Sequence, residues 1–149
     1  MNNNDNLSID LQIVTPEKVV CEENIYQATL PVMDGEVTIL PNHRSYIAAL
    51  KPGEIIYKKK KGEKEGESLA VAGGFVEFHG NKLVVLVDEA ERADEIDLEK
   101  AEEARKRAEE IKSKVIQGEE GSYAHVAATL EREMTRIKVA KKYISRRGF

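Results

Sequence analysis

The sequence predicts a β-plus-α protein: an N-terminal antiparallel β-sandwich, residues 1–88, followed by a C-terminal antiparallel two-helix hairpin, residues 89–149. Up to Asp88, short segments with apolar residues at alternate positions are separated by glycine and proline, which is typical of many short antiparallel strands. After Asp88 the apolar residues recur at intervals of three and four, the period of an amphipathic helix. The change of period predicts the boundary between two domains.

The first predicted strand, Leu7–Ile13, alternates apolar and polar residues over its whole length, as a half-buried strand does. Further strands are predicted at Lys18–Cys21, Ile25–Leu30, Glu36–Leu40, Ser45–Leu50, Gly53–Lys60, Glu67–Ala72, Gly74–His79 and Lys82–Asp88. Turn signals such as Asp34-Gly35 lie between them. The pair Gly73-Gly74 predicts a close backbone approach or a bulge.

Two helices are predicted from two apolar stripes. The first stripe consists of Ala101, Ala104, Ala108, Ile111 and Val115, and the second of Ala127, Leu130, Met134, Ile137 and Ile144. Gly118 is predicted to end the first helix and Ser122 to cap the second, and so short a connection favours antiparallel packing. Because burying an alanine methyl group contributes only roughly 0.8 kcal/mol, we expect a marginal seam and a hairpin that can open.

The composition excludes several classes of function. A formal net charge of −4 over 149 residues argues against a general nucleic-acid binder. The lysine run Lys58–Lys61 gives way at once to glutamates, so we interpret it as a solvated hairpin tip that protects a sheet edge. Cys21 stands alone and cannot form an internal disulfide. No run approaches the ~20 apolar residues of a membrane span, and the opening residues lack the features of a signal or transit peptide, so a soluble cytoplasmic chain is expected.

The sequence contains no motif of a known active site. Phosphate-loop, dinucleotide-binding and nucleophile-elbow patterns do not occur in it, and its three histidines lack metal-ligand spacing. Asp34 and Glu36 are candidates for a general acid–base pair, but Asp34-Gly35 is more typical of a turn. We therefore predict a protein that is not an enzyme and that has no metal and no resident cofactor.

Acidic and basic residues occupy different segments of the C-terminal half. Residues 88–120 carry an acidic surplus, whereas the last helix is basic. Most of these side chains are expected to be solvated, yet the asymmetry indicates an acidic target for the last helix. The candidate contact residues are Arg132, Arg136, Lys138 and Lys142.

Four motifs occur in a fixed order along the chain: LP-x3-GE-x2-ILPNH (Leu30–His43), LKPG (Leu50–Gly53), AGGFVE (Ala72–Glu77) and LVDEAERADEID (Leu86–Asp97). Together they resemble the epsilon subunit of F-type ATP synthases over nearly the whole chain. The resemblance implies a sandwich of about ten strands that carries a two-helix C-terminal hairpin. It also implies a non-catalytic central-stalk (rotor) subunit on the cytoplasmic face of the cell membrane, associated with the membrane only through the complex.

The resemblance further implies partners. The sandwich would couple the gamma subunit to the c-ring, and the helices would inhibit ATP hydrolysis by contacting the catalytic β subunits. Glu36 falls where the family has a loop carboxylate that faces the c-ring, and His43 where its histidine faces gamma; both are expected in an exposed loop. The alternative for His43 is a loop residue that is satisfied locally.

Some members of the family bind ATP on the folded hairpin through a motif similar to IDxxRA. This chain has Ile96, Asp97, Lys100 and Ala101 at the matching positions, with lysine in place of arginine. The supporting positions are matched by Glu91, Arg107, Arg132 and Arg136. Because lysine lacks the planar fork of arginine, weak ATP binding is expected; the alternative is that Asp97 caps the helix and Lys100 is solvated.

Two other functions remain open at this point. One is a free-standing nucleotide-sensing module with no rotor, which would elute as a monomer whether or not a gamma-type partner is present. The other is a small hydrolase, whose turnover would depend on His43 or Asp34.

Overall fold

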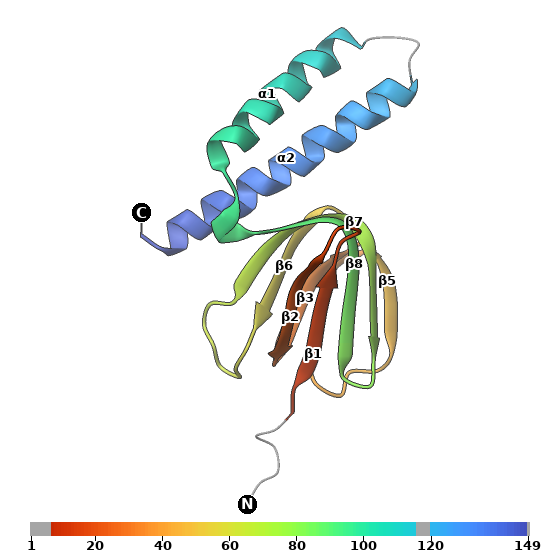
Figure 1. Cartoon of the computed structure of the whole chain (residues 1–149), viewed down its shortest axis with the longest axis vertical. Coiled ribbons are helices and arrows are strands. Elements are labelled where there is room, and N and C mark those ends of the chain that lie inside the picture. Colours follow the sequence, from red (N-terminus) through yellow and green to blue (C-terminus); the bar gives the residue numbers. More distant parts are fainter. Residues whose placement is uncertain (1–6, 116–119, 149) are drawn as a thin grey trace, which may run out of the picture. The chain divides into compact units, whose positions relative to one another are not determined.

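The computed structural model describes residues 7–115 and 120–148 (Figure 1). The chain forms two compact units that meet between Glu91 and Arg92. The predicted boundary followed Asp88, but the last strand continues past it as far as Arg92.

The first unit contains eight strands among its described residues: β1 (Ile9–Val14), β2 (Val19–Ile25), β3 (Gln27–Val32), β4 (Gly35–Ile39), β5 (Tyr46–Leu50), β6 (Gly53–Lys58), β7 (Glu67–His79) and β8 (Lys82–Arg92). Their order is β2-β1-β8-β7-β5-β3-β4, and β6 pairs with β3 and β7. The predicted sandwich is confirmed. The expected number of about ten strands is wrong.

The nine strands predicted from the sequence become eight because Gly73-Gly74 lies inside a strand and does not end one. Strand β7 pairs with β6 before this pair of glycines and with β5 after it. Gly73 and Gly74 have φ values of 58° and 142°, which let the strand turn from one partner to the other. Two predicted strands are therefore one.

The sheet also contains a parallel pair, which the prediction of an antiparallel sandwich did not include. Strand β1 runs antiparallel to β2 but parallel to β8, with Asp10 opposite Lys82 and Val14 opposite Leu86. A parallel pair needs a long connection, and here the strands between β1 and β8 supply it.

The core of the sandwich comes from alternate residues of these strands. On β1 the buried side chains are Ile9, Leu11 and Ile13, and β8 contributes Leu83, Val85 and Val87. Tyr57 is fully buried and donates a hydrogen bond from its hydroxyl to Glu67 Oε2 at 3.2 Å, so its polar atom is satisfied. The main hydrophobic cluster draws all its buried residues from positions 9–87.

Because that cluster needs no residue of the second unit, a chain ending at Ala93 is expected to fold alone. It should give a cooperative thermal transition with a β-type circular dichroism spectrum. A chain that is unfolded at 25 °C would contradict the independence of the sandwich. The full-length protein serves as the reference for the melting temperature.

The second unit contains the short 3-10 helix η2 (Ala93–Glu95) and the helices α1 (Leu98–Lys114) and α2 (Glu120–Arg146). The two long helices lie side by side, as Figure 1 shows. Ala101 and Ala108 of the predicted first stripe are buried, whereas Ile111 is exposed. The narrow alanine seam is thus present in α1.

The buried stripe of α2 differs from the predicted one. Its buried residues are Val126, Glu133, Ile137, Val139 and Ala140. Met134, placed in the predicted stripe, is 54 % exposed. Because α2 begins at Glu120, Ser122 lies within its first turn and is not its N-cap; Gly118 lies outside the described residues.

Candidate partner-docking site

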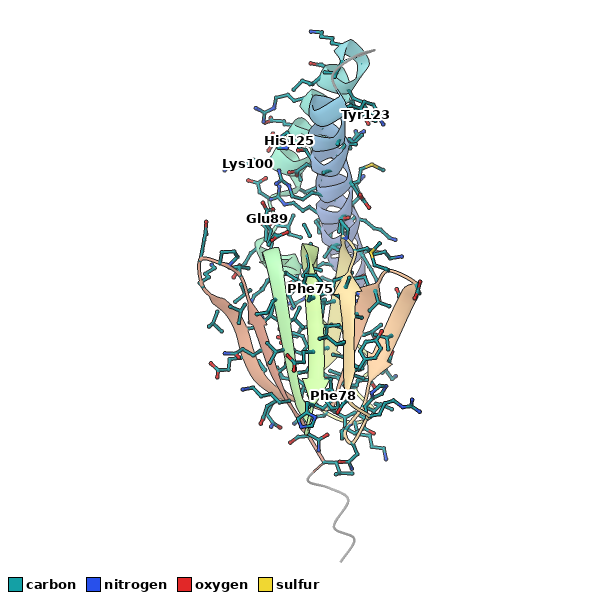
Figure 2. All side chains as sticks on the ribbon, turned by 90° about the vertical axis from the view of Figure 1, so that its right-hand side faces the viewer. Phe75, Phe78, Glu89, Lys100, Tyr123 and His125 are labelled. Atoms are coloured by element: carbon teal, nitrogen blue, oxygen red, sulfur yellow. The ribbon has the colours of Figure 1, made fainter. Side chains whose placement is uncertain are left out.

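The outer face of the sandwich unit carries a row of apolar side chains, which we call the apolar row: Val14, Ala49, Phe75 and Leu86. In β7, Val76 and Phe78 point into the core, so Phe75 points outward and is 63 % exposed (Figure 2). Leu86 is 54 % exposed on β8 for the same reason, because its neighbours Val85 and Val87 are buried. Large exposed apolar groups that gather on one face are a mark of an interaction surface.

Strand register brings this row together. Phe75 is opposite Ala49 on β5, and Leu86 is opposite Val14 on β1. A Cβ atom on Gly74 would lie 2.8 Å from the Cα of Val87, so the backbones of β7 and β8 are in close contact there. This contact places the next residue, Phe75, beside Leu86. The row therefore crosses four neighbouring strands.

A shallow groove of about 440 Å³ runs along the same place. It is lined by Val14, Thr15, Pro16, Gly74, Phe75, Leu86, Val87 and Asp88. Ile47, which is 73 % exposed, extends the apolar surface along β5, two residues from Ala49 on the same side of the strand. The groove and the row suit a partner with apolar side chains.

Glu36 is exposed, but it lies in strand β4 and not in a loop. It is opposite Pro31 of β3, next to the turn at Met33 and Asp34. Met33 at this turn is 64 % exposed. The carboxylate is accessible to a partner at this edge. The strand predicted from the sequence at Glu36–Leu40 is confirmed, whereas the loop placement expected from the family resemblance is wrong.

His43 lies in the connection between β4 and β5, yet it is half-buried. Its Nδ1 is 2.8 Å from the carbonyl oxygen of Arg44, and its ring makes edge contacts with Tyr46 and Phe78 at centroid distances of 6.0 and 5.9 Å. The expectation of an exposed side chain was therefore wrong. Its ring contributes to packing at this end of the sandwich.

The two residues are thus expected to differ in their effect on stability. His43→Ala should lower the free energy of unfolding by about 1–2 kcal/mol, because edge contacts with two rings and a hydrogen bond are lost. That corresponds to a fall of roughly 4–16 °C in melting temperature for a domain of this size. Glu36→Gln should leave the melting temperature unchanged. Equal losses for both variants in a thermal melt would contradict this placement.

The candidate nucleotide residues at the start of α1 are bonded within the helix. Asp97 is the N-cap, and its carboxylate accepts a hydrogen bond from the backbone N–H of Lys100 at 3.1 Å. Lys100 Nζ is 3.9 Å from Asp97 Oδ2, and the side chain is 80 % exposed. Ile96 is half-buried and Ala101 is fully buried. The interpretation of Asp97 as a helix cap is confirmed.

The other candidates are spread over several elements. Arg107 is exposed on α1, and Glu91 is half-buried near the end of β8, in the first unit. On α2, Lys138 is exposed and Lys142 is half-buried.

Arg132 and Arg136 share a carboxylate that the sequence prediction did not single out. Glu133 is only 3 % exposed, and it is the one buried charged residue among those the structure describes. Its Oε2 accepts a hydrogen bond from Arg136 Nη1 at 2.8 Å, and its Oε1 is 3.4 Å from Arg132 Nη2. Two cations thus offset the cost of burying this charge.

One residue of the lysine run after β6, Lys59, forms ion pairs with two strands of the sheet. Lys59 Nζ is 3.3 Å from Glu67 Oε1 and 3.4 Å from Glu23 Oε2. The hydrogen bond to Glu67 and the attraction of both carboxylates raise the pKa of Lys59 above its usual value. This lysine therefore links β2, which contains Glu23, to β7, which contains Glu67, although the two strands are not neighbours in the strand order.

Within residues 7–115 and 120–148, no three His, Cys, Asp or Glu side chains are grouped so that they could hold a metal ion. In the same residues, neither long helix has a stretch apolar enough to cross a membrane.

The apolar row was missed by the sequence prediction, although a signal for it existed. Residues Leu83–Val87 form an unbroken apolar run, which is typical of a strand covered on both faces. In the isolated sandwich only one face of β8 is covered by its own core. The uncovered apolar positions of that run indicate a partner.

Comparisons with known proteins agree with this architecture. Residues 8–93 match the family described as the beta-sandwich domain of the ATP synthase Delta/Epsilon chain, and residues 94–141 match its long alpha-helix domain. The chain is 44 % identical over 135 residues to the ATP synthase epsilon chain of Dehalococcoides mccartyi, covering 90 % of this chain and 93 % of the relative. It is 40 % identical over 137 residues to that of Herpetosiphon aurantiacus, covering 91 % and 96 %.

Solved structures show the same fold. A chain in the cryo-EM structure of the Euglena gracilis mitochondrial ATP synthase superposes with a TM-score of 0.73 at 22 % identity, covering 91 % of this chain and 82 % of that one. A chain in the central stalk/c-ring structure of the Tetrahymena thermophila enzyme gives 0.58 at 16 % identity, covering 89 % and 96 %. With two family domains and relatives at this identity over nine-tenths of its length, the chain belongs to the family of ATP synthase epsilon chains, which are non-catalytic subunits.

Proposed function

We propose that the chain is a central-stalk rotor subunit whose sandwich couples the gamma subunit to the c-ring and whose helices inhibit ATP hydrolysis. The observation that carries the coupling role is the apolar row with Phe75 and Leu86 at its centre, on the outer face of the sandwich. The solved relative from Tetrahymena thermophila belongs to a central stalk/c-ring assembly, which supports the same role here.

The apolar row is the proposed gamma-docking surface. Ile47, exposed on the same side of β5 as Ala49, extends it toward the N-terminal end of β5, which follows the connection that contains His43. The connection that contains His43 would then border the gamma surface at this end, with the His43 ring packed on Phe78 and Tyr46. Glu36, exposed on β4, remains the candidate for contact with the c-ring. Membrane association at the cytoplasmic face would follow from these contacts alone.

Co-purification tests the coupling role directly. The full chain is mixed with tagged gamma subunit, with and without the c-ring, and the complexes are separated by size. Co-elution with gamma is expected. Elution as a monomer in every mixture would favour the free-standing nucleotide-sensing module instead.

The inhibitory role is supported by the charge and the packing of α2. Its basic candidates Arg132, Arg136, Lys138 and Lys142 are suited to an acidic surface on the catalytic β subunits. The seam on α1 consists of small residues, with Ala101 and Ala108 buried, so little free energy of burial is lost when the hairpin opens. Truncation after Gly118 removes α2 and should raise ATP hydrolysis by the assembled enzyme. Unchanged hydrolysis would remove the support for inhibition.

Weak ATP binding is the further part of the proposal. Asp97 and Lys100 lie side by side at the start of α1, but Lys100 lacks the bidentate fork of arginine. Calorimetry on the isolated chain should therefore detect heat only near millimolar ATP. Lys100→Arg should tighten binding, and Asp97→Asn, which keeps the cap, should weaken it.

Lys106→Arg is the matched control, because it makes the same chemical change at an exposed position of the same helix. It should leave ATP binding unchanged. The absence of heat at millimolar ATP for both the native chain and Lys100→Arg would exclude the nucleotide site. The docking proposal would not be affected by that result.

A further inference from the structure

Two asparagines at one end of the sandwich bond to each other across 39 positions of sequence. The backbone N–H of Asn42 donates to Asn81 Oδ1 at 2.6 Å, and Asn81 Nδ2 donates to Asn42 Oδ1 at 3.0 Å. Both have left-handed backbone, with φ values of 66° and 59°, and they are the two residues other than glycine with positive φ in the described chain. Such conformations are uncommon and have to be held by their surroundings.

This pair joins two connections that are far apart in sequence. Asn42 lies between β4 and β5, in residues Leu40–Ser45, which we call the His43 loop. Asn81 lies in the turn between β7 and β8, and its carbonyl oxygen also accepts a hydrogen bond from Asp10 N at 2.9 Å. The turn is thus fixed to β1 on one side and to the His43 loop on the other.

Two further contacts hold the same loop against β7. Ser45 Oγ is 2.9 Å from His79 Nδ1, and the His43 ring packs edge-on against Phe78. The loop closes on itself as well, since His43 N donates to Leu40 O at 3.1 Å. The loop is therefore attached along its length and has little freedom to change shape.

The hydrogen bonds that hold this loop lie outside the main hydrophobic cluster, although the His43 ring packs against Phe78, which belongs to it. Asn42 and Ser45 are exposed and Asn81 is half-buried; none of the three belongs to that cluster. Surface hydrogen bonds of this kind contribute little to global stability. Their main physical effect is to remove loop conformations before a partner arrives, which lowers the entropy cost of docking.

We propose that Asn81 is a positioning residue for docking: it presets the His43 loop in the shape that the gamma subunit binds. This inference rests on the proposed function. It assigns a role to a residue that itself need not touch the partner. The two hydrogen bonds between Asn42 and Asn81 join the turn to the loop, and we call them the clasp.

The test compares Asn81→Gly with the native chain in binding to isolated gamma subunit. Glycine accepts the positive φ of the turn, so the variant loses both side-chain hydrogen bonds without backbone strain. We expect affinity for gamma to fall about tenfold, mainly through a slower association rate. The melting temperature should stay close to that of the native chain, while amide exchange at His43 and Ser45 becomes faster.

Asn24→Ala is the matched control. It also removes a surface hydrogen bond of an asparagine, from Asn24 Nδ2 to Asp10 Oδ1 at 2.9 Å, but on strand β2. Affinity and loop exchange should match those of the native chain. A double variant, Asn42→Gly with Asn81→Gly, should bind no more weakly than Asn81→Gly alone, because both changes break the same clasp.

The outcomes separate the two proposals. If the native chain does not bind gamma, the proposed function fails and the positioning role fails with it. If the native chain binds and Asn81→Gly binds equally well, only the positioning role is overturned. A loss that appears equally in Asn24→Ala would also overturn it, because the effect would then not come from the loop.

Discussion

Replacing Gly74 with alanine is expected to lower the free energy of unfolding of the sandwich by about 2–6 kcal/mol. A Cβ atom there would collide with the carbonyl oxygen of Leu86 and lie 2.8 Å from the Cα of Val87, and overpacking of this kind costs about 1–3 kcal/mol. The φ of 142° adds backbone strain of about 1–3 kcal/mol for a residue with a side chain. At roughly 4–8 °C per kcal/mol, thermal melting followed by circular dichroism should show a fall of at least about 8 °C.

Gly80→Ala provides the control. Gly80 also has a positive φ, of 55°, but no atom lies within 4 Å of its added Cβ. Only backbone strain of about 1–2 kcal/mol is then expected. Equal losses at Gly74 and Gly80 would show that β7 and β8 are not in close contact at Gly74. The placement of Phe75 beside Leu86 would lose its support in the same experiment.

Gly74 also illustrates what the sequence could and could not predict about the fold. The pair Gly73-Gly74 was correctly predicted to mark a close backbone approach. It was also taken as the end of a strand, because glycine weakens strand pairing in general. Here the first half of β7 pairs with β6 and the second half with β5. A change of partner within one strand is a tertiary feature, and local sequence patterns do not reveal it.

The helices show a similar limit. Helical periodicity placed Met134 in the buried stripe because methionine is apolar, whereas the structure buries its neighbour Glu133. Burial of a carboxylate becomes tolerable once cations pair with it, and Arg132 and Arg136 do so. A prediction from periodicity uses only the polarity of each single residue, so it does not include ion pairs that allow a charged residue to be buried. In α1 the prediction holds in part: Ala101 and Ala108 of the predicted stripe are buried, whereas Ile111 is exposed.

The candidate site was only partly predictable. Motif resemblance singled out Glu36 and His43, but the exposure of each depends on the turn beside it and on rings from other strands. The apolar row was missed because alternation identifies two faces of a strand without saying which one meets the core. Strand pairing decides that question, and the pairing of β8 with β1 and β7 left Leu86 on the outside.

Phe75→Asp is expected to weaken binding to gamma by about 100-fold or more. Aromatic anchors at the centre of an interface commonly contribute 2 kcal/mol or more on truncation, and about 2.8 kcal/mol corresponds to a factor of 100. A carboxylate at this position would also have to be desolvated against an apolar partner, which adds to the loss. Because Phe75 is 63 % exposed in the isolated chain, its melting temperature should change little. Titration of the folded variant with isolated gamma subunit measures the effect.

Leu7→Asp is the control for the added charge, since Leu7 is a 41 % exposed apolar residue before the start of β1, at the opposite end of that strand from Val14. It should bind gamma as the native chain does, whereas Ile47→Asp should weaken binding in the same direction as Phe75→Asp. Equal losses at Phe75 and Leu7 would mean that gamma binding responds to overall charge and not to this surface. A loss confined to Phe75 and Ile47 places the interface on β5 and β7, where the uncovered apolar side chains of the sandwich already indicate a partner.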